Sequence, residues 1–129
     1  MRTEKRLPET VGDLMTVDLV AMLPHDRASR ARNTLLTLGV HALPVMEGND
    51  VLGIITSADL VDDWPPDEPV SSFMTPVPTL INVEASIAEA AELMVAHRIH
   101  HLMVTDEIEV IGILSSLDLV QALIEAPPQ

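Results

Sequence analysis

Two copies of one stretch decide the fold: Gly53-Ile54-Ile55-Thr56-Ser57-Ala58-Asp59 and, 59 residues later, Gly112-Ile113-Leu114-Ser115-Ser116-Leu117-Asp118. The same shift aligns the rest of the chain without a gap and gives about fourteen identical pairs, where composition alone gives roughly four. A repeat of this size predicts two copies of one small unit that stack and bury a common core. A site on one copy is therefore expected on the other.

Each repeat shows the same order of signals, namely strand, helix, strand, strand, helix. In the first repeat, a short apolar turn precedes these elements, which are expected at Val17–Leu23, Asp26–Leu38, Val40–Met46, Val51–Thr56 and Ser57–Asp63. In the second, a capping box at Ser86 and Glu89 opens a helix, and the elements are expected at Ile87–His97, Ile99–Thr105, Val110–Leu114 and Ser116–Ala126. Gly39 is expected to stop the first helix, with Ala28, Ala31, Leu35 and Leu38 on its buried face.

The sequence thus predicts an α/β (α+β) fold of two βαββα motifs packed pseudo-symmetrically into one module. Prolines and acidic residues between the copies mark a linker. The expected divisions are an extension at residues 1–10, a first motif at 11–64, a linker at 65–69 and a second motif at 70–126.

Charge and composition exclude several classes of function. The net charge is −13, from 20 acidic and 7 basic residues, which disfavours nucleic acid and anionic membrane surfaces as partners. One Trp, one Phe and no Tyr leave little for base stacking, and the absence of Cys removes disulfides and thiol catalysis. The chain starts with charged residues and holds no apolar run of membrane-spanning length, so a cytoplasmic protein is expected.

The repeated stretch places a hydroxyl residue where a strand ends and a helix begins. Free backbone N–H groups there favour anions, and an aspartate one turn later can accept two hydrogen bonds from a ribose diol. The glycine is expected to leave space for close backbone approach. The alternative is that Ser/Thr-x-x-Asp serves only as a capping box, although two copies at one register favour a ligand site.

At this level of detail the chain resembles a tandem pair of cystathionine-beta-synthase (CBS) domains over about residues 11–124. The resemblance is carried by the two stretches above, by Met15-Thr16 and Met74-Thr75, and by the segments Gly39–Val45 and Arg98–Val104. It implies two clefts between the motifs that take AMP, ADP, ATP or S-adenosylmethionine as a regulatory ligand, with no cofactor required. It also implies a homodimer, expected to bury Leu60-Val61 and Leu119-Val120.

The resemblance further implies a role for each matching residue. The aspartates match ribose-binding positions, the hydroxyls meet ribose or phosphate, the histidines face phosphate, and the Leu-Pro segment meets the adenine edge. The implied ligand-binding residues are His41, Ala42, Leu43, Pro44, Thr56, Asp59, His100, His101, Leu102, Ser115 and Asp118. Ala42 lacks the cation that the family holds there, so the second site, with His100, His101 and Arg98, is expected to be better equipped for phosphate. Met103 replaces a proline of the family, a departure that concerns the local backbone.

Other candidates are weaker. His97, His100 and His101 do not fit a metal site, because adjacent strand residues point to opposite faces. Arg27, Arg30 and Arg32 form a solvated face or reach ligand phosphates of a neighbouring subunit. No catalytic constellation is present, and the only lysine is Lys5. A non-enzymatic, ligand-sensing regulatory module is predicted, with a ligand-free dimerisation or protein-interaction module as the alternative and a further protein partner possible in either case.

Overall fold

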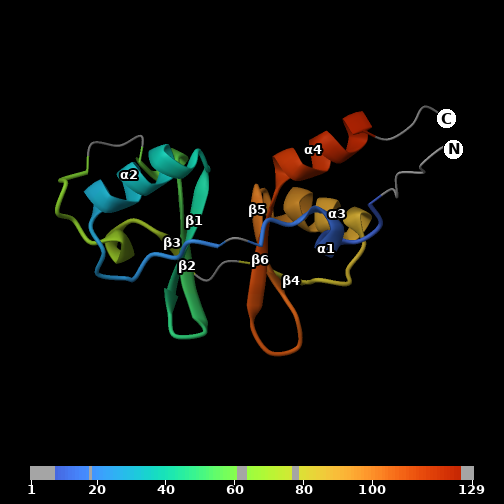
Figure 1. Ribbon diagram of the computed structural model, residues 1–129, viewed down its shortest axis with the longest axis horizontal. Helices are drawn as coiled ribbons and strands as arrows, with labels where there is room; N and C mark the ends of the chain where they lie inside the picture. Colours follow the sequence, from blue (N-terminus) through green and yellow to red (C-terminus); the bar gives the residue numbers. More distant parts are fainter. Residues whose placement is uncertain (1–7, 18, 61–63, 77–78, 126–129) are drawn as a thin grey trace, which may run out of the picture. The chain divides into compact units, whose positions relative to one another are not determined.

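The computed structural model describes residues 8–17, 19–60, 64–76 and 79–125, which form two compact units. One, here called the central unit, comprises residues 18–78. The other, the split unit, joins residues 1–17 to residues 79–129. Each unit holds helices and a three-stranded sheet (Figure 1). The predicted mixture of helix and strand is confirmed.

The central unit has an antiparallel sheet in the order β1-β2-β3. Its elements are α2 (Ala28–Leu38), β1 (Ala42–Glu47), β2 (Asp50–Thr56), the 3₁₀ turns η1 (Ala58–Leu60) and η2 (Val70–Ser72), and β3 (Thr75–Pro76). Gly39 ends α2 in the left-handed conformation, as predicted. The helix expected at Ser57–Asp63 is a single 3₁₀ turn in its described part, and residues 61–63 lie outside the described residues.

The split unit has the sheet order β4-β5-β6, in which β4 runs parallel to β5. Its elements are α1 (Val11–Leu14), β4 (Leu80–Asn82), α3 (Ile87–His97), β5 (His101–Thr105), β6 (Val110–Ser115) and α4 (Ser116–Glu125). The Oγ of Ser86 accepts the N–H of Glu89 at 3.1 Å, which confirms the predicted start of α3. In the β5–β6 turn, the N–H groups of Glu109 and Ile108 donate to Asp106 and lower its pKa.

The strand expected at Val17–Leu23 does not form in the described residues, whereas its counterpart in the second repeat is β4. The difference lies in the neighbouring strand. Met103 donates its N–H to the carbonyl of Thr79 at 3.0 Å, but Pro44 at the aligned position has no N–H to donate. Among its described residues, the first repeat therefore keeps a single bridge at this place, between Met22 and Val45.

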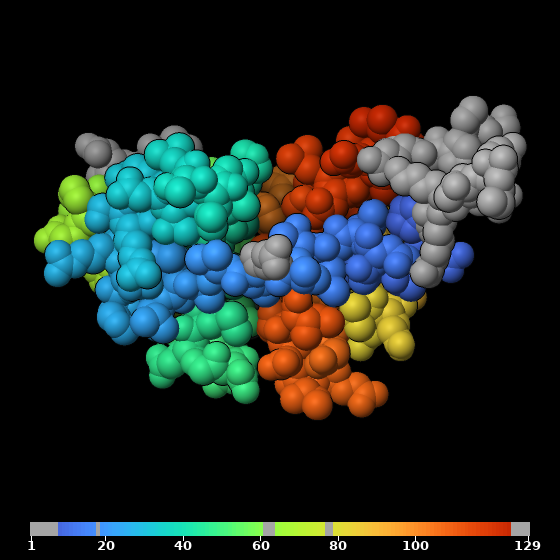
Figure 2. All heavy atoms as spheres, in the orientation of Figure 1, coloured from blue at the N-terminus to red at the C-terminus, as the bar shows by residue number. Residues whose placement is uncertain are grey.

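The opening segment of each repeat packs on the sheet of the other repeat. In the split unit, Thr16 pairs with Ile113 through bonds of 2.9 and 3.0 Å, and Val11 donates to the carbonyl of Ala85 at 2.9 Å. Figure 2 shows this N-terminal segment, in blue, against the orange strands and the red helix of the same unit. In the central unit, Thr75 of β3 pairs with Ile54 of β2 in the equivalent way. A short helical turn and a β-paired Met-Thr segment thus pass from each repeat to the other.

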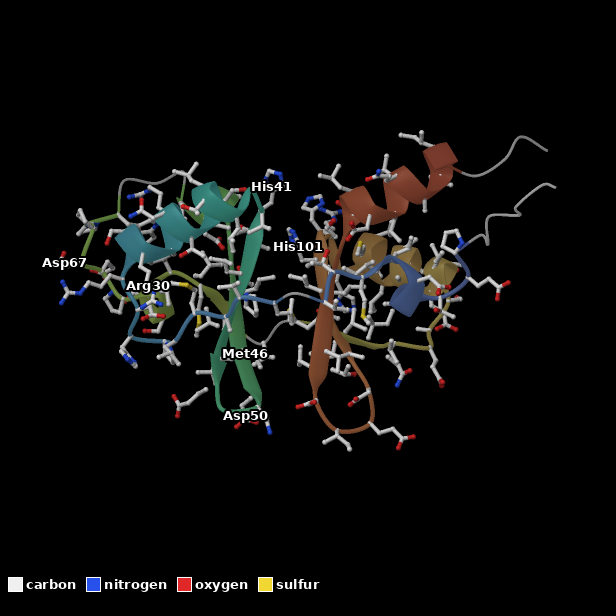
Figure 3. The ribbon with its side chains drawn as sticks, in the orientation of Figure 1. Arg30, His41, Met46, Asp50, Asp67 and His101 are labelled. Carbon is white, nitrogen blue, oxygen red and sulfur yellow. The ribbon has the colours of Figure 1, made fainter. Side chains whose placement is uncertain are left out.

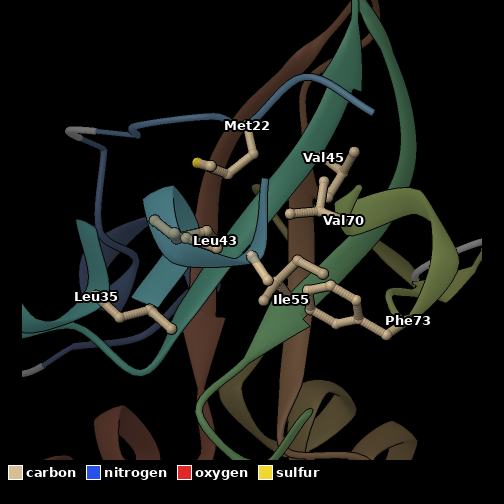
Figure 4. Packing of buried hydrophobic residues seen from close by; sticks show 9 residues of the cluster. Met22, Leu35, Leu43, Val45, Ile55, Val70 and Phe73 are labelled. Atoms are coloured by element: carbon tan, nitrogen blue, oxygen red, sulfur yellow. The ribbon is translucent and has the colours of Figure 1, made fainter. Parts of the chain in front are cut away.

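Each unit has its own hydrophobic core, built mainly from aliphatic side chains. The core of the central unit gathers Met22, Leu35, Leu43, Val45, Ile55, Val70 and Phe73, among others (Figure 4). Trp64 stacks on Phe73 at its edge, with ring centroids 5.0 Å apart. The prediction for Leu38 was wrong, because this side chain is 47% exposed while Ala28, Ala31 and Leu35 are buried. Position 38 immediately precedes the left-handed Gly39, where the chain turns away from the helix.

Candidate functional site

The repeated motif of the split unit folds as a closed ring of hydrogen bonds at the start of α4. The N–H of Ser115 donates to Oδ2 of Asp118 at 2.8 Å, and the N–H of Asp118 donates back to Oγ of Ser115 at 3.2 Å. Both side chains are half-buried. The sequence puts them there because Ser115 ends β6 and α4 begins at the next residue. This is a capping box, and it uses only one oxygen of the carboxylate.

The motif of the central unit makes the same ring and one bond more. Thr56 donates both its N–H and its hydroxyl to Oδ2 of Asp59, at 2.8 and 3.0 Å. The N–H of Asp59 donates to Oγ1 of Thr56 at 3.3 Å. In addition, Nε1 of Trp64 donates to the backbone carbonyl of Asp59 at 2.9 Å. The sequence motif did not reveal this tryptophan contact, because Trp64 lies beyond it on the linker side.

The two motifs therefore differ in what they leave available. The Thr56 hydroxyl proton is committed to Asp59, whereas the Ser115 hydroxyl donates to no described group. The first motif leads into a three-residue turn and the second into a ten-residue helix. A helix of that length adds a partial positive charge at its N-terminus, which a single turn does not. Of the two motifs, only the second therefore lies at the start of a helix long enough for its N-terminus to favour an anion.

A histidine stands beside each motif. The N–H of Ser116 donates to the carbonyl of His100 at 2.8 Å, and Oγ of Ser116 lies 3.4 Å from Nδ1 of the same histidine. In the central unit, Ser57 donates to the carbonyl of His41 at 2.9 Å. His41 lies at the end of β1 remote from the hairpin turn that carries Asp50 (Figure 3). The side chains of His41 and His100 are exposed. Ser57 and Ser116, whose N–H groups bond to these histidines, were not among the predicted site residues.

The remaining predicted residues line the neighbouring strand. Ala42 pairs with Thr56 across the sheet, and His101 pairs with Ser115, so each lies beside its hydroxyl residue. Leu43, Pro44 and Leu102 have buried side chains. These three side chains therefore have almost no exposed surface with which to contact a ligand.

The expectation that each motif glycine permits close backbone approach is confirmed, and the approaching chain is the protein's own. A Cβ on Gly53 would stand 2.6 Å from the carbonyl oxygen of Thr75 and 2.7 Å from the sulfur of Met74. A Cβ on Gly112 would stand 2.6 Å from the sulfur of Met15. Each glycine makes room for the Met-Thr segment that arrives from the other repeat.

Two further features lie outside these motifs. Within the described residues, no group of three or more His, Cys, Asp or Glu side chains is arranged to hold a metal ion. An open hollow of about 430 Å³ lies over α2 and is lined by Arg30, Asn33 and Thr37, among others. None of the predicted ligand-binding residues lines it.

Comparison with known proteins identifies relatives of this chain. The family model for the CBS domain matches twice, at residues 11–64 and 70–125. An uncharacterized protein of Bacillus subtilis, YlbB, is 30% identical over 116 residues, covering 84% of this chain and 78% of that protein. Inosine-5'-monophosphate dehydrogenase of Korarchaeum cryptofilum is 29% identical over 102 residues, 78% of this chain but only 21% of the enzyme.

Solved structures agree with this match. A CBS-domain-containing protein of Agrobacterium tumefaciens is 26% identical with a TM-score of 0.83, covering 95% of this chain and 99% of that one. CBSX2 in complex with AMP is 26% identical with a TM-score of 0.78, covering 92% and 98%. Among the described helices, none has the length and apolar character needed to cross a membrane. The chain belongs to the CBS-domain family and carries two copies of the domain.

Proposed function

We propose that this protein is a regulatory module that binds an adenosine nucleotide through the Ser115–Asp118 motif, with the Thr56–Asp59 motif as a second, weaker position. Binding, rather than chemical conversion, is the proposed role. The candidate ligands are AMP, ADP, ATP and S-adenosylmethionine. A cytoplasmic location is part of the proposal.

One observation carries it: capping uses only one oxygen of each aspartate. Oδ2 of Asp118 accepts the N–H of Ser115, while no described donor bonds to Oδ1. A half-buried carboxylate oxygen beside a hydroxyl is suited to accept a hydrogen bond from a ribose diol. The capping box and the ligand site are therefore compatible, because the cap fixes the carboxylate and leaves one of its oxygens for the sugar.

The comparison with CBSX2 supports the choice of ligand class, since that protein was solved in complex with AMP. Two local groups can attract the phosphate of such a ligand, namely the partial positive charge at the N-terminus of α4 and the nearby ring of His100. Against a net charge of −13, such local groups must supply the attraction for a phosphate.

The test begins with protein purified and denatured, whose released small molecules are identified by mass. Ligand-free protein is then titrated calorimetrically with AMP, ADP, ATP and S-adenosylmethionine, with GMP as the control that keeps ribose and phosphate but changes the base. A true ligand at a hundred times its Kd stabilises the fold by about 2.7 kcal/mol. Absence of binding by every adenosine compound at millimolar concentration overturns the proposal.

A second candidate function is protein interaction through α4. Leu117, Val120 and Ile124 recur at helical spacing and are 61%, 49% and 78% exposed. We propose that a second copy of the chain covers them in a homodimer. Of the residues expected at the dimer interface, Val120 belongs to this exposed stripe, and Leu60 and Leu119 are partly buried against the cores of their own units. Val61 lies outside the described residues.

A further inference from the structure

Arg98 has an unusual backbone conformation for its residue type. Its φ and ψ are 54° and 46°, and it is the only residue other than glycine with positive φ in the described part of the chain. The aligned residue of the first repeat is Gly39, with φ 66° and ψ 29°. Both close the same helix-ending turn: Ile99 donates to the carbonyl of Met94 at 3.0 Å, and Val40 donates to that of Leu35 at 3.2 Å.

Glycine adopts this conformation without penalty, whereas a side chain makes it unfavourable. The first repeat uses the favourable residue and the second does not. A strained backbone at a residue that is not glycine indicates that the side chain has a role, here that of Arg98. No described carboxylate forms an ion pair with Arg98, and the side chain is exposed. Pairing within the unit therefore does not explain it.

Arg98 is an isolated basic residue in acidic surroundings. It is the only Lys or Arg among the described residues of the split unit, where acidic side chains are numerous. It precedes His100 by two residues, which is a span of at most about 7 Å of chain. The carbonyl of His100 is bonded to Ser116, the first residue of α4. The one Lys or Arg of the described split unit therefore lies two residues before the strand end that is bonded to the Ser115–Asp118 motif.

We propose that Arg98 binds a phosphate of the ligand held by this motif and so selects phosphorylated adenosine compounds over adenosine itself and over S-adenosylmethionine, whose sulfonium is positive. The inference rests on the proposed function and adds the residue that sets ligand class. A guanidinium in this place supplies charge-assisted hydrogen bonds that the imidazoles and serine hydroxyls nearby do not match.

The experiment compares three variants with the wild type. Arg98→Gln removes the charge and keeps the strained backbone, Arg98→Lys keeps the charge, and Arg98→Gly removes both charge and strain. Asn49→Asp, in the exposed turn between β1 and β2 of the central unit, is the control that lowers the net charge by the same amount. Affinities for AMP, ATP, adenosine and S-adenosylmethionine are measured by calorimetry, and melting temperatures by circular dichroism.

We expect Arg98→Gln and Arg98→Gly to weaken AMP and ATP binding about tenfold or more, while adenosine binding stays unchanged. Arg98→Lys retains most of the affinity, and Asn49→Asp retains all of it. Arg98→Gly is expected to melt about 2–8 °C higher than the wild type, because glycine relieves the left-handed backbone. A variant that is more stable yet binds phosphate less well separates the ligand role from a structural one.

Unchanged AMP affinity in Arg98→Gln overturns the inference and leaves the proposed function standing, as does an equal loss of adenosine and AMP binding. Tripolyphosphate serves as a probe without a nucleoside. If it binds the wild type but not Arg98→Gln while no adenosine compound binds, the phosphate role of Arg98 stands and the proposed function fails. If the wild type binds neither, both are overturned.

Discussion

The sulfur of Met74 lies 2.7 Å from the point where a Cβ on Gly53 would stand, and the sulfur of Met15 lies 2.6 Å from the same point on Gly112. These two pairs join residues of different repeats. They explain why Met-Thr and glycine recur together at the same shift of 59 residues. The glycine and the methionine are two halves of one contact, which forms only when the opening segments are exchanged.

Gly53→Ala and Gly112→Ala are expected to destabilise the protein by about 1–3 kcal/mol each, because the added methyl group overpacks an occupied space. Urea denaturation followed by circular dichroism measures the change in the free energy of unfolding. Ala58→Gly, in the exposed turn after Thr56, is the control for a surface change of one methyl group. Wild-type stability in both alanine variants contradicts the packing described here.

Shortening the methionine is expected to rescue Gly112→Ala more than Gly53→Ala. Beside Gly112 the nearest atom is the sulfur of Met15, with the carbonyl of Thr16 at 3.0 Å, whereas beside Gly53 the backbone carbonyl of Thr75 is itself only 2.6 Å away. A side chain can be removed but a backbone cannot. Double-mutant cycles with Met15→Ala and Met74→Ala give the two coupling energies. A larger coupling at Gly53 refutes the expectation.

Asp118→Asn is expected to weaken nucleotide binding about tenfold or more, and more than Asp59→Asn does, since a charge-assisted bond to the ribose contributes about 1.5–3 kcal/mol. Calorimetric titration with AMP measures this. The matched ligand is 2′-deoxy-AMP, which should bind the wild type less well but lose little further on Asp118→Asn. If the aspartates act only as caps, both variants melt earlier and keep wild-type affinity.

The two hydroxyls are expected to respond in opposite ways. Thr56→Val removes a donor to Asp59 as well as an acceptor, so it should cost more stability than Ser115→Ala, by roughly 1 kcal/mol for the additional bond. Ser115→Ala should instead weaken AMP binding, because its proton is not used within the described protein. Chemical denaturation and calorimetry on both variants measure the two effects. Equal loss of affinity at both positions argues against unequal sites.

Leu117→Glu is expected to convert a homodimer to a monomer, because it places a charge in the exposed apolar stripe of α4. In the monomer itself the change should alter stability by less than about 0.5 kcal/mol, as for other surface positions. Multi-angle light scattering at micromolar concentration gives the mass. Ile108→Glu, at a hairpin position that is 87% exposed, is the matched control. A wild-type monomer with and without nucleotide contradicts the dimer.

The sequence by itself determined what depends on neighbours along the chain. The sequence was sufficient to predict the repeat, the bounds of α3, the end of α2 at Gly39, and the pairing of Ser115 with Asp118 at a helix start. Each arises from spacing of a few residues, namely helical periodicity, a cap or a stop. The absence of a strand near Met22 also has a cause in the sequence, namely the proline at position 44, which has no N–H to donate. The segment that this proline affects, around Met22, lies about twenty residues earlier in the chain.

Only the tertiary structure decided where the opening segments pack and which atoms remain available for a ligand. The pairing of Thr16 with Ile113 joins residues nearly a hundred positions apart, and no local preference encodes it. That pairing brings Met15 and Thr16 against Gly112, where the sequence predicted close backbone approach but not which segment makes it. The two motifs have identical spacing, yet the Thr56 hydroxyl donates to Asp59 and the Ser115 hydroxyl does not donate to Asp118. The sequence does not determine this difference, because the partner of a hydroxyl depends on its rotamer and surroundings rather than on residue order.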